Sequence, residues 1–351
     1  MKSKNLSEKI HRSIETKGFK YITLDPVLET KYILQRSGEN FKKFLFSFYD
    51  LNGKELCLRP DLTISSVIRF IQNKKDNREK VFYSGEAFRK TYQKKDSIIK
   101  NQIGYEILAS KNNQKDDKEI IDTALKILKN SGFKKSILKI GNVELFNLLI
   151  NKLDIPRRWK NRLKRNYWNE NYFNELLKRL ETNSDIDPVF VEIDKSKYKK
   201  MKTENHNKII AGRTYREVLD RFNMKINDPR KSSTGKKNTN IIKQFLKIKC
   251  PIEKAPKILN FFFKKNKINI VVGKDFFPLS KNSNKNLKIE FSASNGREVE
   301  LYSSMIFSIE VKVKSKFMNF ISGGRYDQLT NNLGFRKIPA VGAAVNMNLY
   351  E

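Results

Sequence analysis

Residues 80–110 read KVFYSGEAFRKTYQKKDSIIKNQIGYEILAS, and this stretch decides the fold. Its two ends, KVFYSGEAFRK and NQIGYEILAS, are rich in β-branched and aromatic residues, as strands are, and a lysine-rich loop over residues 90–100 joins them. The pattern predicts a hairpin with a long tip. Upstream, FLFSFYD (44–50) and ELCLRPD (55–61) flank an Asn-Gly pair, which is typical of a second hairpin.

Helical periodicity surrounds these hairpins. Leu6, Ile10 and Ile14 lie four residues apart on one helical face, and Gly18 ends that helix. TISSVIRFIQ (63–72) is also helical, and residues 119–153 alternate helix, strand (SILKIGNV) and helix, which we expect to pack on the sheet. LKIEFSAS, ELYSSMIFSIEVKV and FMNFISGG predict strands that complete the sheet, and AVGAAVNMNL closes it as a helix or strand.

The middle of the chain has a different character. Helices are expected near NRLKRNYWNENYFNELLKRL (161–180), TYREVLDRF (214–222) and APKILNFFFKKN (255–266), and NDPRKSSTGKKNTN (227–240) predicts a flexible linker. The chain thus divides into a first core part (1–154), a mainly helical insertion (155–270) and a second core part (271–351). The predicted fold class is α+β, an antiparallel sheet flanked by helices.

Composition limits the classes of function. A chain of 351 residues with 38% hydrophobic content can bury a sizeable core. Cys57 and Cys250 lie far apart without a CxxC pair, so neither a disulfide framework nor a zinc site is indicated, and a cytoplasmic location fits best. The N-terminus carries no apolar signal region, and no run approaches the ~20 apolar residues of a membrane span. We expect no membrane association.

The net charge of +34 is compatible with a polyanion partner held through its phosphates. The lysines are nevertheless spread along the whole chain instead of gathering in one arginine-rich stripe. This distribution favours a general compositional bias over a nucleic-acid footprint. We therefore expect no nucleic-acid partner.

Several other features have plain structural interpretations. His11 and His206 have no ligand-spaced partners, so we expect solvated side chains and neither catalysis nor a metal site. The paired glycines of GGRYD (323–327) lack a P-loop context, which favours a tight strand-end turn over a phosphate cradle. The aromatic runs at 261–263 and 276–277 are expected in the core and not as base-stacking platforms.

The order of these segments resembles a class II aminoacyl-tRNA synthetase core of the histidyl type. YITLDPVLE (21–29) resembles motif 1, LRPDLT (58–63) the LRPEGT amino-acid loop, AFRK (87–90) the start of motif 2, and QIGYE (102–106) the QxGxE strand of the amino-acid pocket. REVELYSSMIF (297–307) is similar to the histidine-specific RGLDYYTGTVF segment, and GGRYDQL with AVGAAVNMN resembles the lead into motif 3. The resemblance implies a dimer with Pro26 at its interface.

Departures from the family's pattern concern ATP and tRNA. The stretch matching motif 3 reads GAAVNMNLY and lacks the arginine that clamps the ATP triphosphate in the family, and Thr91 replaces an acidic residue of motif 2. A missing cation at a transferring phosphate costs orders of magnitude in rate. We expect no catalytic residues, no cofactor and no enzyme activity. Since the chain ends after the motif 3 segment, we also expect no anticodon-binding domain.

The residues that free histidine needs are largely kept. The resemblance implies a histidine site made of Asp61, Thr63, Arg89, Gln102, Glu106, Arg297, Leu301 and Tyr302. Four of them, at positions 61, 63, 102 and 106, are hydrogen-bond acceptors that suit an α-ammonium. The two arginines suit the α-carboxylate. Leu301 and Tyr302 replace the two tyrosines that wall the imidazole, and Glu300 is expected to accept from a ring N–H. Without the resemblance, Asp61 and Glu106 are equally an acid/base pair or ordinary polar residues.

This pattern resembles the family of ATP phosphoribosyltransferase regulatory subunits, which are histidyl-tRNA synthetase paralogues without the anticodon domain. AGRTYREVLDRF (211–222) resembles a GxRxxxE[VI]xxRF stretch of its alphaproteobacterial members. The resemblance implies a non-catalytic subunit that activates a short catalytic subunit in a hetero-octamer and mediates feedback by histidine in the first step of histidine synthesis. Two alternatives stay open: a divergent ligase forming an aminoacyl-adenylate, and a tRNA-binding scaffold.

Overall fold

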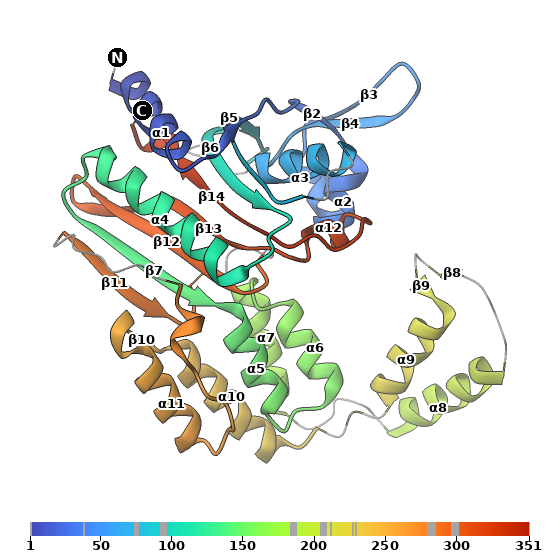
Figure 1. Ribbon diagram of the computed structural model, residues 1–351. Helices are drawn as coiled ribbons and strands as arrows, with labels where there is room; N and C mark the ends of the chain where they lie inside the picture. Colours follow the sequence, from blue (N-terminus) through green and yellow to red (C-terminus); the bar gives the residue numbers. More distant parts are fainter. Residues whose placement is uncertain are drawn as a thin grey trace.

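A nine-stranded sheet runs through the centre of the molecule in the order β1-β5-β6-β14-β13-β12-β7-β11-β10 (Figure 1). Neighbouring strands are antiparallel except for the pairs β1/β5 and β11/β7. The strands are Lys20–Tyr21 (β1), Glu79–Phe88 (β5), Ile99–Leu108 (β6), Ser136–Asn142 (β7), Lys249–Pro251 (β10), Leu287–Ser292 (β11), Met305–Val313 (β12), Lys316–Arg325 (β13) and Ala340–Asn346 (β14). The predicted α+β class is confirmed.

The computed structural model describes residues 2–37, 39–73, 77–91, 97–182, 188–203, 209–210, 213–226, 228, 230–278, 286–295 and 302–350. The predicted hairpin over residues 80–110 is β5 and β6, which pair from Glu79↔Leu108 to Phe88↔Ile99. The sequence allows either a helix or a strand for AVGAAVNMNL; the segment forms β14 followed by the 3₁₀ turn η4 (Met347–Tyr350). The core sheet is therefore assembled largely from the segments that the sequence marks as strands.

Helices α1 (Lys2–Glu15) and α4 (Asn113–Ser131) cover one face of the sheet (Figure 1). Leu6, Ile10 and Ile14 are buried there, as the four-residue spacing predicts. Gly18, at φ +78°, follows the helix in the left-handed conformation that glycine adopts without penalty.

A smaller layer covers β5 and β6 on the opposite face. It contains α2 (Thr30–Ser37), α3 (Leu62–Gln72), the 3₁₀ turn η1 (Glu39–Phe44), the short helix α12 (Leu329–Asn332) and a three-stranded sheet of β2 (Val27–Glu29), β4 (Glu55–Leu58) and β3 (Ser47–Tyr49). The predicted hairpin around Asn-Gly is β3–β4, and Gly53 takes φ +75° in its turn. This layer carries the LRPDLT loop on the face of the large sheet opposite α1 and α4, which is called the open face below.

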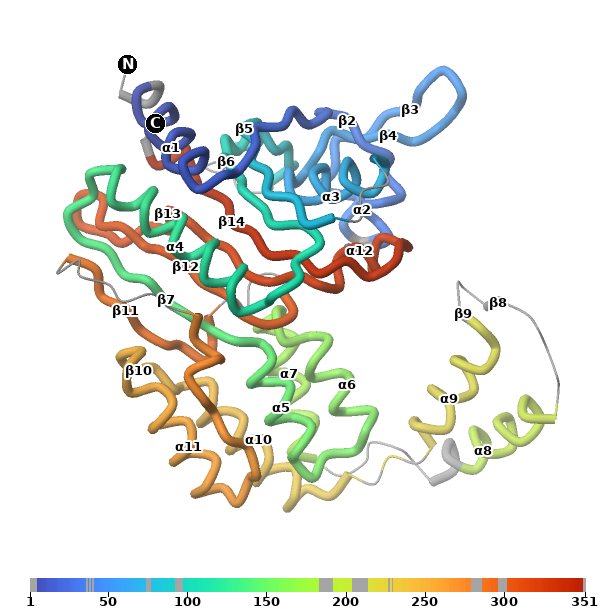
Figure 2. The backbone as a smooth tube through the Cα atoms, viewed as in Figure 1, coloured from blue at the N-terminus to red at the C-terminus, as the bar shows by residue number. Residues whose placement is uncertain are grey.

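A helical unit lies beyond the ends of β7 and β10 (Figure 2). It comprises α5 (Val143–Lys152), α6 (Arg157–Arg165), α7 (Glu170–Leu180), α10 (Ser232–Leu246), α11 (Ala255–Lys265) and the 3₁₀ turns η2 (Ile252–Lys254) and η3 (Lys274–Phe276). Helices α8 (Pro188–Thr203) and α9 (Tyr215–Ile226), with the two-residue strands β8 (Ile209–Ile210) and β9 (Arg213–Thr214), lie to one side of it, and α9 contacts α6. The boundaries at residues 154/155 and 270/271 stay a prediction.

The flexible linker expected over residues 227–240 is wrong for most of that segment, because residues 232–240 are the first part of α10. The polar appearance of SSTGKKNTN hides a close helix–helix contact. A Cβ on Gly235 would lie 1.8 Å from the Leu180 carbonyl oxygen, so only glycine lets α10 approach α7 this closely. Thr239 is buried in the same contact and donates to the Leu177 carbonyl of α7, while the buried Asn238 donates to the Asp154 carbonyl between α5 and α6.

Three smaller expectations also change. His11 is not a solvated side chain: it is half-buried, and its ring lies edge-on against Phe82. The glycines of GGRYD lie inside β13 and not in a turn. Phe261 is 69% exposed, whereas Phe262, Phe263 and Phe277 are buried as predicted. His206 lies outside the described residues, and none of the described helices has the length and apolar content needed to cross a membrane.

Candidate functional site

The LRPDLT loop delivers two predicted site residues to the start of α3. Asp61 caps this helix, because its Oδ1 accepts from the backbone N–H of Ile64 at 3.1 Å. Its other oxygen, Oδ2, lies 3.5 Å from a guanidinium nitrogen of Arg89, and Arg89 Nε donates to the Pro60 carbonyl at 2.7 Å. Both side chains stay partly exposed. A carboxylate and a guanidinium are therefore fixed side by side at the edge of the open face.

Glu106 lies deeper, on β6, and is only 1% exposed. Its Oε1 accepts from the hydroxyls of Tyr83 at 2.6 Å and Thr63 at 3.0 Å, and its Oε2 accepts from the hydroxyl of Tyr326. Each carboxylate oxygen thus has a donor inside the protein. Glu106 is the centre of a buried cluster, and Thr63 is the member of that cluster nearest to Asp61 in sequence.

Burial raises the pKa of Glu106 to about 7, although the three hydroxyl donors oppose that shift by stabilising the anion. The nearby charge of Asp61 adds to the rise. Burial also raises the pKa of Tyr83 and Tyr326 well above the ordinary value, so both phenols stay protonated and donate. The site consequently holds one acid that changes charge close to neutral pH.

Glycine makes room for this cluster in the sheet. Gly342 on β14 lies directly opposite Glu106, and a Cβ there would be 1.4 Å from Glu106 Oε2. Gly104, two residues before Glu106, would place a Cβ 2.3 Å from the ring of Tyr83. The carboxylate and the phenol ring occupy the volume that side chains at these positions would fill.

Gln102 lies farther along the same face of β6, since alternate residues of a strand share a face. It is half-buried and lines a polar pocket of about 380 Å³. The pocket is lined by Ser97, Lys100, Gln102, Asn319, Ser322, Ala344, Asn346 and Asn348. This lining contains one cation and no carboxylate. Along the strand Gln102 is about 14 Å from Glu106 at ~3.4 Å per residue, so the two are in different parts of the site.

The third predicted region is only partly described. Arg297, Glu300 and Leu301 lie outside the described residues. Tyr302 is half-buried, and its ring lies so close to Gly324 on β13 that a Cβ there would be 2.7 Å from it. The structure therefore places Tyr302, one of the two positions predicted to wall an imidazole, beside Gly324 of the large sheet.

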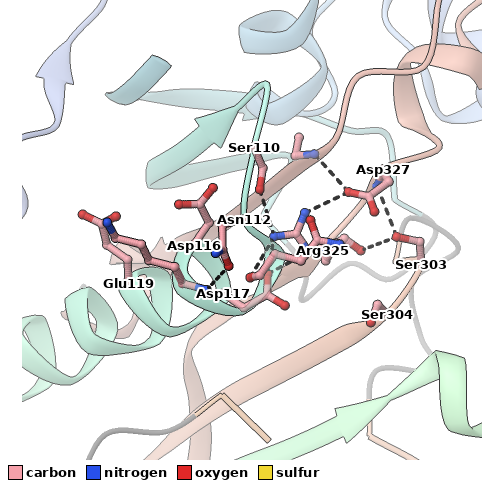
Figure 3. A network of polar contacts seen from close by, with 12 residues as sticks. Ser110, Asn112, Asp116, Asp117, Glu119, Ser303, Ser304, Arg325 and Asp327 are labelled. Carbon is pink, nitrogen blue, oxygen red and sulfur yellow. Dashed lines mark hydrogen bonds and ion pairs between the residues drawn. The ribbon is translucent and has the colours of Figure 1, made fainter. Parts of the chain in front are cut away.

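A second polar network supports the GGRYD segment (Figure 3). Arg325 is 1% exposed; its Nε donates to Asp117 Oδ1 at 2.8 Å and its Nη1 to Asp327 Oδ1 at 3.0 Å. Asp327 in turn accepts from the backbone N–H of Ala340 at 3.1 Å, and Ser303 Oγ donates to the Arg325 carbonyl at 3.2 Å. Burial raises the pKa of Asp117 to about 6 against the opposing effect of Arg325. The network fixes the backbone on either side of Tyr326.

Arg59 performs a similar task for the LRPDLT loop. It is 7% exposed, and it donates from Nε to the Glu86 carbonyl at 2.8 Å and from Nη1 to the Leu24 carbonyl at 2.6 Å. Burial lowers the pKa of its guanidinium. It ties the loop to β5 and to the chain before Pro26, which is exposed at the start of β2.

The structure thus brings together Asp61, Thr63 and Arg89 and places Glu106 beneath them, while Gln102 lies in the adjoining pocket. Sequence reasoning missed Tyr83 and Tyr326, which hold the Glu106 carboxylate. The first was visible as an alternate residue of a strand facing QIGYE, and the second as the tyrosine of GGRYD. Among the described residues, no group of three His, Cys, Asp or Glu side chains is placed to bind a metal ion.

The region matching motif 3 is described up to residue 350. It forms β14 and η4, and the Leu349 side chain packs partly against the main core. Residues 340–349 contain no lysine or arginine. No cation of this segment is therefore available to a phosphate on the open face.

Comparison with known proteins gives a consistent relationship. Residues 1–227 match a family model described as histidyl-tRNA synthetase. The ATP phosphoribosyltransferase regulatory subunit of Sinorhizobium fredii is 23% identical over 93% of this chain and 90% of that protein, and that of Brucella anthropi is 25% identical over 89% and 87%.

Solved structures share the fold. An ATP phosphoribosyltransferase regulatory subunit/histidyl-tRNA synthetase from Bacillus halodurans superposes with a TM-score of 0.59 at 18% identity, covering 99% of this chain and 78% of that one. A histidine–tRNA ligase subunit from Alicyclobacillus acidocaldarius gives 0.55 at 16% identity, with 99% and 91% covered. Since the family model spans residues 1–227 of 351, the chain belongs to the histidyl-tRNA synthetase family.

Proposed function

We propose that this chain is a regulatory subunit of ATP phosphoribosyltransferase that binds free histidine and does not adenylate it. The names of its relatives support a regulatory role in histidine biosynthesis. The partner is then a short catalytic subunit, and the chain itself pairs as a dimer through the region of Pro26.

One observation carries the ligand assignment: the Asp61 carboxylate and the Arg89 guanidinium lie 3.5 Å apart and are both partly exposed. A free amino acid carries an ammonium and a carboxylate on one carbon. The Asp61 carboxylate can bind the ammonium, and the Arg89 guanidinium can bind the carboxylate. The Thr63 hydroxyl and the Gln102 amide supply further polar contacts. Glu106, being buried, orients the Thr63 hydroxyl and does not itself meet the ligand.

The lack of cations in the segment matching motif 3 supports the proposed absence of adenylation. Transfer to the α-phosphate of ATP needs cations on the triphosphate. Residues 340–349 supply none, and the adjoining pocket offers only Lys100. A ligase that forms an aminoacyl-adenylate would need a cation from another part of the chain.

Calorimetric titration with histidine, together with ATP–pyrophosphate exchange, tests this proposal. Asp61→Asn keeps a good helix cap while removing the charge, so the expected loss of one charge-assisted contact, ~1.5–3 kcal/mol, raises the Kd about 10- to 150-fold. Glu55→Gln is the matched control, since it removes the charge from a surface pair with Lys42 at 2.9 Å on β4. Histidine-dependent exchange would overturn the regulatory assignment, and equal Kd values for Asp61→Asn and the native chain would overturn the site.

A further inference from the structure

The described residues 188–203, 209–210 and 213–226 form α8, β8, β9 and α9, an arm at one side of the helical unit that α9 contacts through α6 (Figures 1 and 2). The chain leaves the unit after α7 and returns at Asp228 and Arg230. The two ends of the arm are held together, because Arg230 Nη1 donates to the Arg179 carbonyl at 2.7 Å and Ser232 Oγ donates to the Glu181 carbonyl at 2.8 Å. The arm is therefore an excursion from a closed base.

The two ends of the arm, called the base, are held by the buried carboxylate of Asp228. Asp228, 9% exposed, accepts from Trp159 Nε1 at 2.9 Å and from Arg230 Nε at 3.0 Å. The Arg230 guanidinium also lies 4.4 Å from the centre of the Trp159 ring. These contacts belong to α6 and to the chain before α10, so they persist without the arm.

Helix α9 leaves part of its apolar face accessible in the described part of the arm. Val218, Phe222 and Ile226 of α9 follow one another every four residues, which is the spacing of one apolar helix face, yet all three are only half-buried. Tyr215 is the one residue of α9 that is buried in the described part of the chain. By contrast, α7 buries its whole apolar face: Phe173, Leu176, Leu177 and Leu180. An apolar face left half open is typical of a surface that meets a partner.

The charge on α8, which packs against α9, indicates the kind of partner. Helix α8 carries exposed lysines at positions 195, 197, 199, 200 and 202. Lys195 pairs with Glu192 at 2.8 Å, whereas no described carboxylate lies within ion-pairing distance of Lys197, Lys199 or Lys200. An acidic surface opposite these lysines would attract the arm and speed association.

We infer that the arm docks onto an acidic, partly apolar surface of a partner protein, which under the proposed function is the catalytic subunit. Protein interfaces combine an apolar centre with a charged rim, as Val218, Phe222 and the α8 lysines do. Recognition of single-stranded RNA adds aromatic stacking platforms to the basic residues, whereas Val218 and Ile226 of this face are aliphatic. The inference names the surface through which the regulatory chain reaches its partner, and it rests on the proposed function.

Two arm variants test the inference in the full chain. The first replaces residues 183–227 with an eight-residue Gly-Ser linker, which spans up to ~26 Å between the adjacent ends of the base. The second carries Lys197→Glu, Lys199→Glu and Lys200→Glu, which reverses charge on exposed positions without altering the core. The control carries Lys312→Glu, Lys314→Glu and Lys316→Glu, three exposed lysines at the β12–β13 turn.

Association with the short catalytic subunit is measured by analytical size exclusion and by a salt-dependent binding titration. We expect both arm variants to raise the Kd at least 10-fold while histidine binding and the melting temperature stay near those of the native chain. The lysine control keeps the native Kd. If the deletion variant does not fold, the charge-reversed variant decides alone.

The outcomes separate the two levels of the argument. Arm variants that bind the catalytic subunit as the native chain does would overturn the arm assignment and leave the proposed function intact. A native chain that fails to bind it would overturn the proposed function. Tight, salt-dependent binding of unfractionated tRNA that is lost in the arm variants, with catalytic-subunit binding unchanged, would assign the arm to RNA and refute the inference.

Discussion

Replacing Glu106 with glutamine should change the pH dependence of stability in a calculable way. The folded protein holds the proton of Glu106 with a pKa of about 7, because the carboxyl is buried, whereas the ordinary value is 4.5. As the pH rises from 4.5 to 7, the unfolded chain releases this proton first. The free energy of unfolding of the native sequence therefore falls through this window and no longer changes with the titration of Glu106 above it.

The size of the effect follows from the difference of about 2.5 pKa units, at ~1.36 kcal/mol each, which is about 3 kcal/mol. Glu106→Gln does not titrate, and its amide oxygen still accepts from Tyr83 and Thr63. The free energy of unfolding of the variant minus that of the native chain should thus be about 3 kcal/mol higher at pH 8 than at pH 4, because only the native chain loses stability as the pH rises.

Urea unfolding at pH 4, 6 and 8, followed by circular dichroism, measures this difference. Asp117, whose pKa is about 6, also titrates in this range, but it does so in both proteins and cancels in the comparison. A stability difference between variant and native chain that is constant from pH 4 to pH 8 would refute the account of Glu106. Glu55→Gln, on the surface, should change stability by less than ~1 kcal/mol at every pH.

The other predictions concern packing and buried charge. Gly342→Ala places a methyl group on the Glu106 carboxylate, and thermal unfolding should show a loss of ~1–3 kcal/mol, whereas Gly273→Ala, whose nearest neighbour is 4.0 Å away, should be close to neutral. Gly235→Ala should destabilise to a similar or greater extent, because its Cβ meets a backbone oxygen; a melting temperature equal to that of Gly273→Ala would contradict this contact. Arg325→Met leaves Asp117 buried without its cation and should cost ~3–5 kcal/mol in urea unfolding, and adding Asp117→Asn should restore part of it; additive losses in the double variant would argue against the pair.

The buried Glu106 cluster also sharpens the functional picture. A site that binds an amino acid reversibly needs rigid polar groups, since ordering them on binding would cost affinity. Thr63 is fixed by Glu106, Asp61 by its own helix, and Arg89 by the Pro60 carbonyl. These contacts hold the exposed polar groups in place before a ligand arrives.

Local signals in the sequence determined the main elements. The β-branched and aromatic content of residues 80–110, the Asn-Gly turn and the four-residue spacing of Leu6, Ile10 and Ile14 are local features, so they are readable without the fold. Asp61, the last residue of the predicted strand segment ELCLRPD, is instead the N-cap of α3 in the structure. The histidine assignment for these residues stays a prediction.

Only the tertiary structure decided what surrounds Glu106 and where residues 232–240 belong. The Tyr326 hydroxyl reaches Glu106 across 220 positions of sequence, and Gly342 lies opposite it because β14 pairs with β6 in one register. The segment around Gly235 is polar and typical of a flexible linker, but it is helical and packs against α7. Long-range register and close helix contact depend on the whole core, and a short window of sequence does not contain that information.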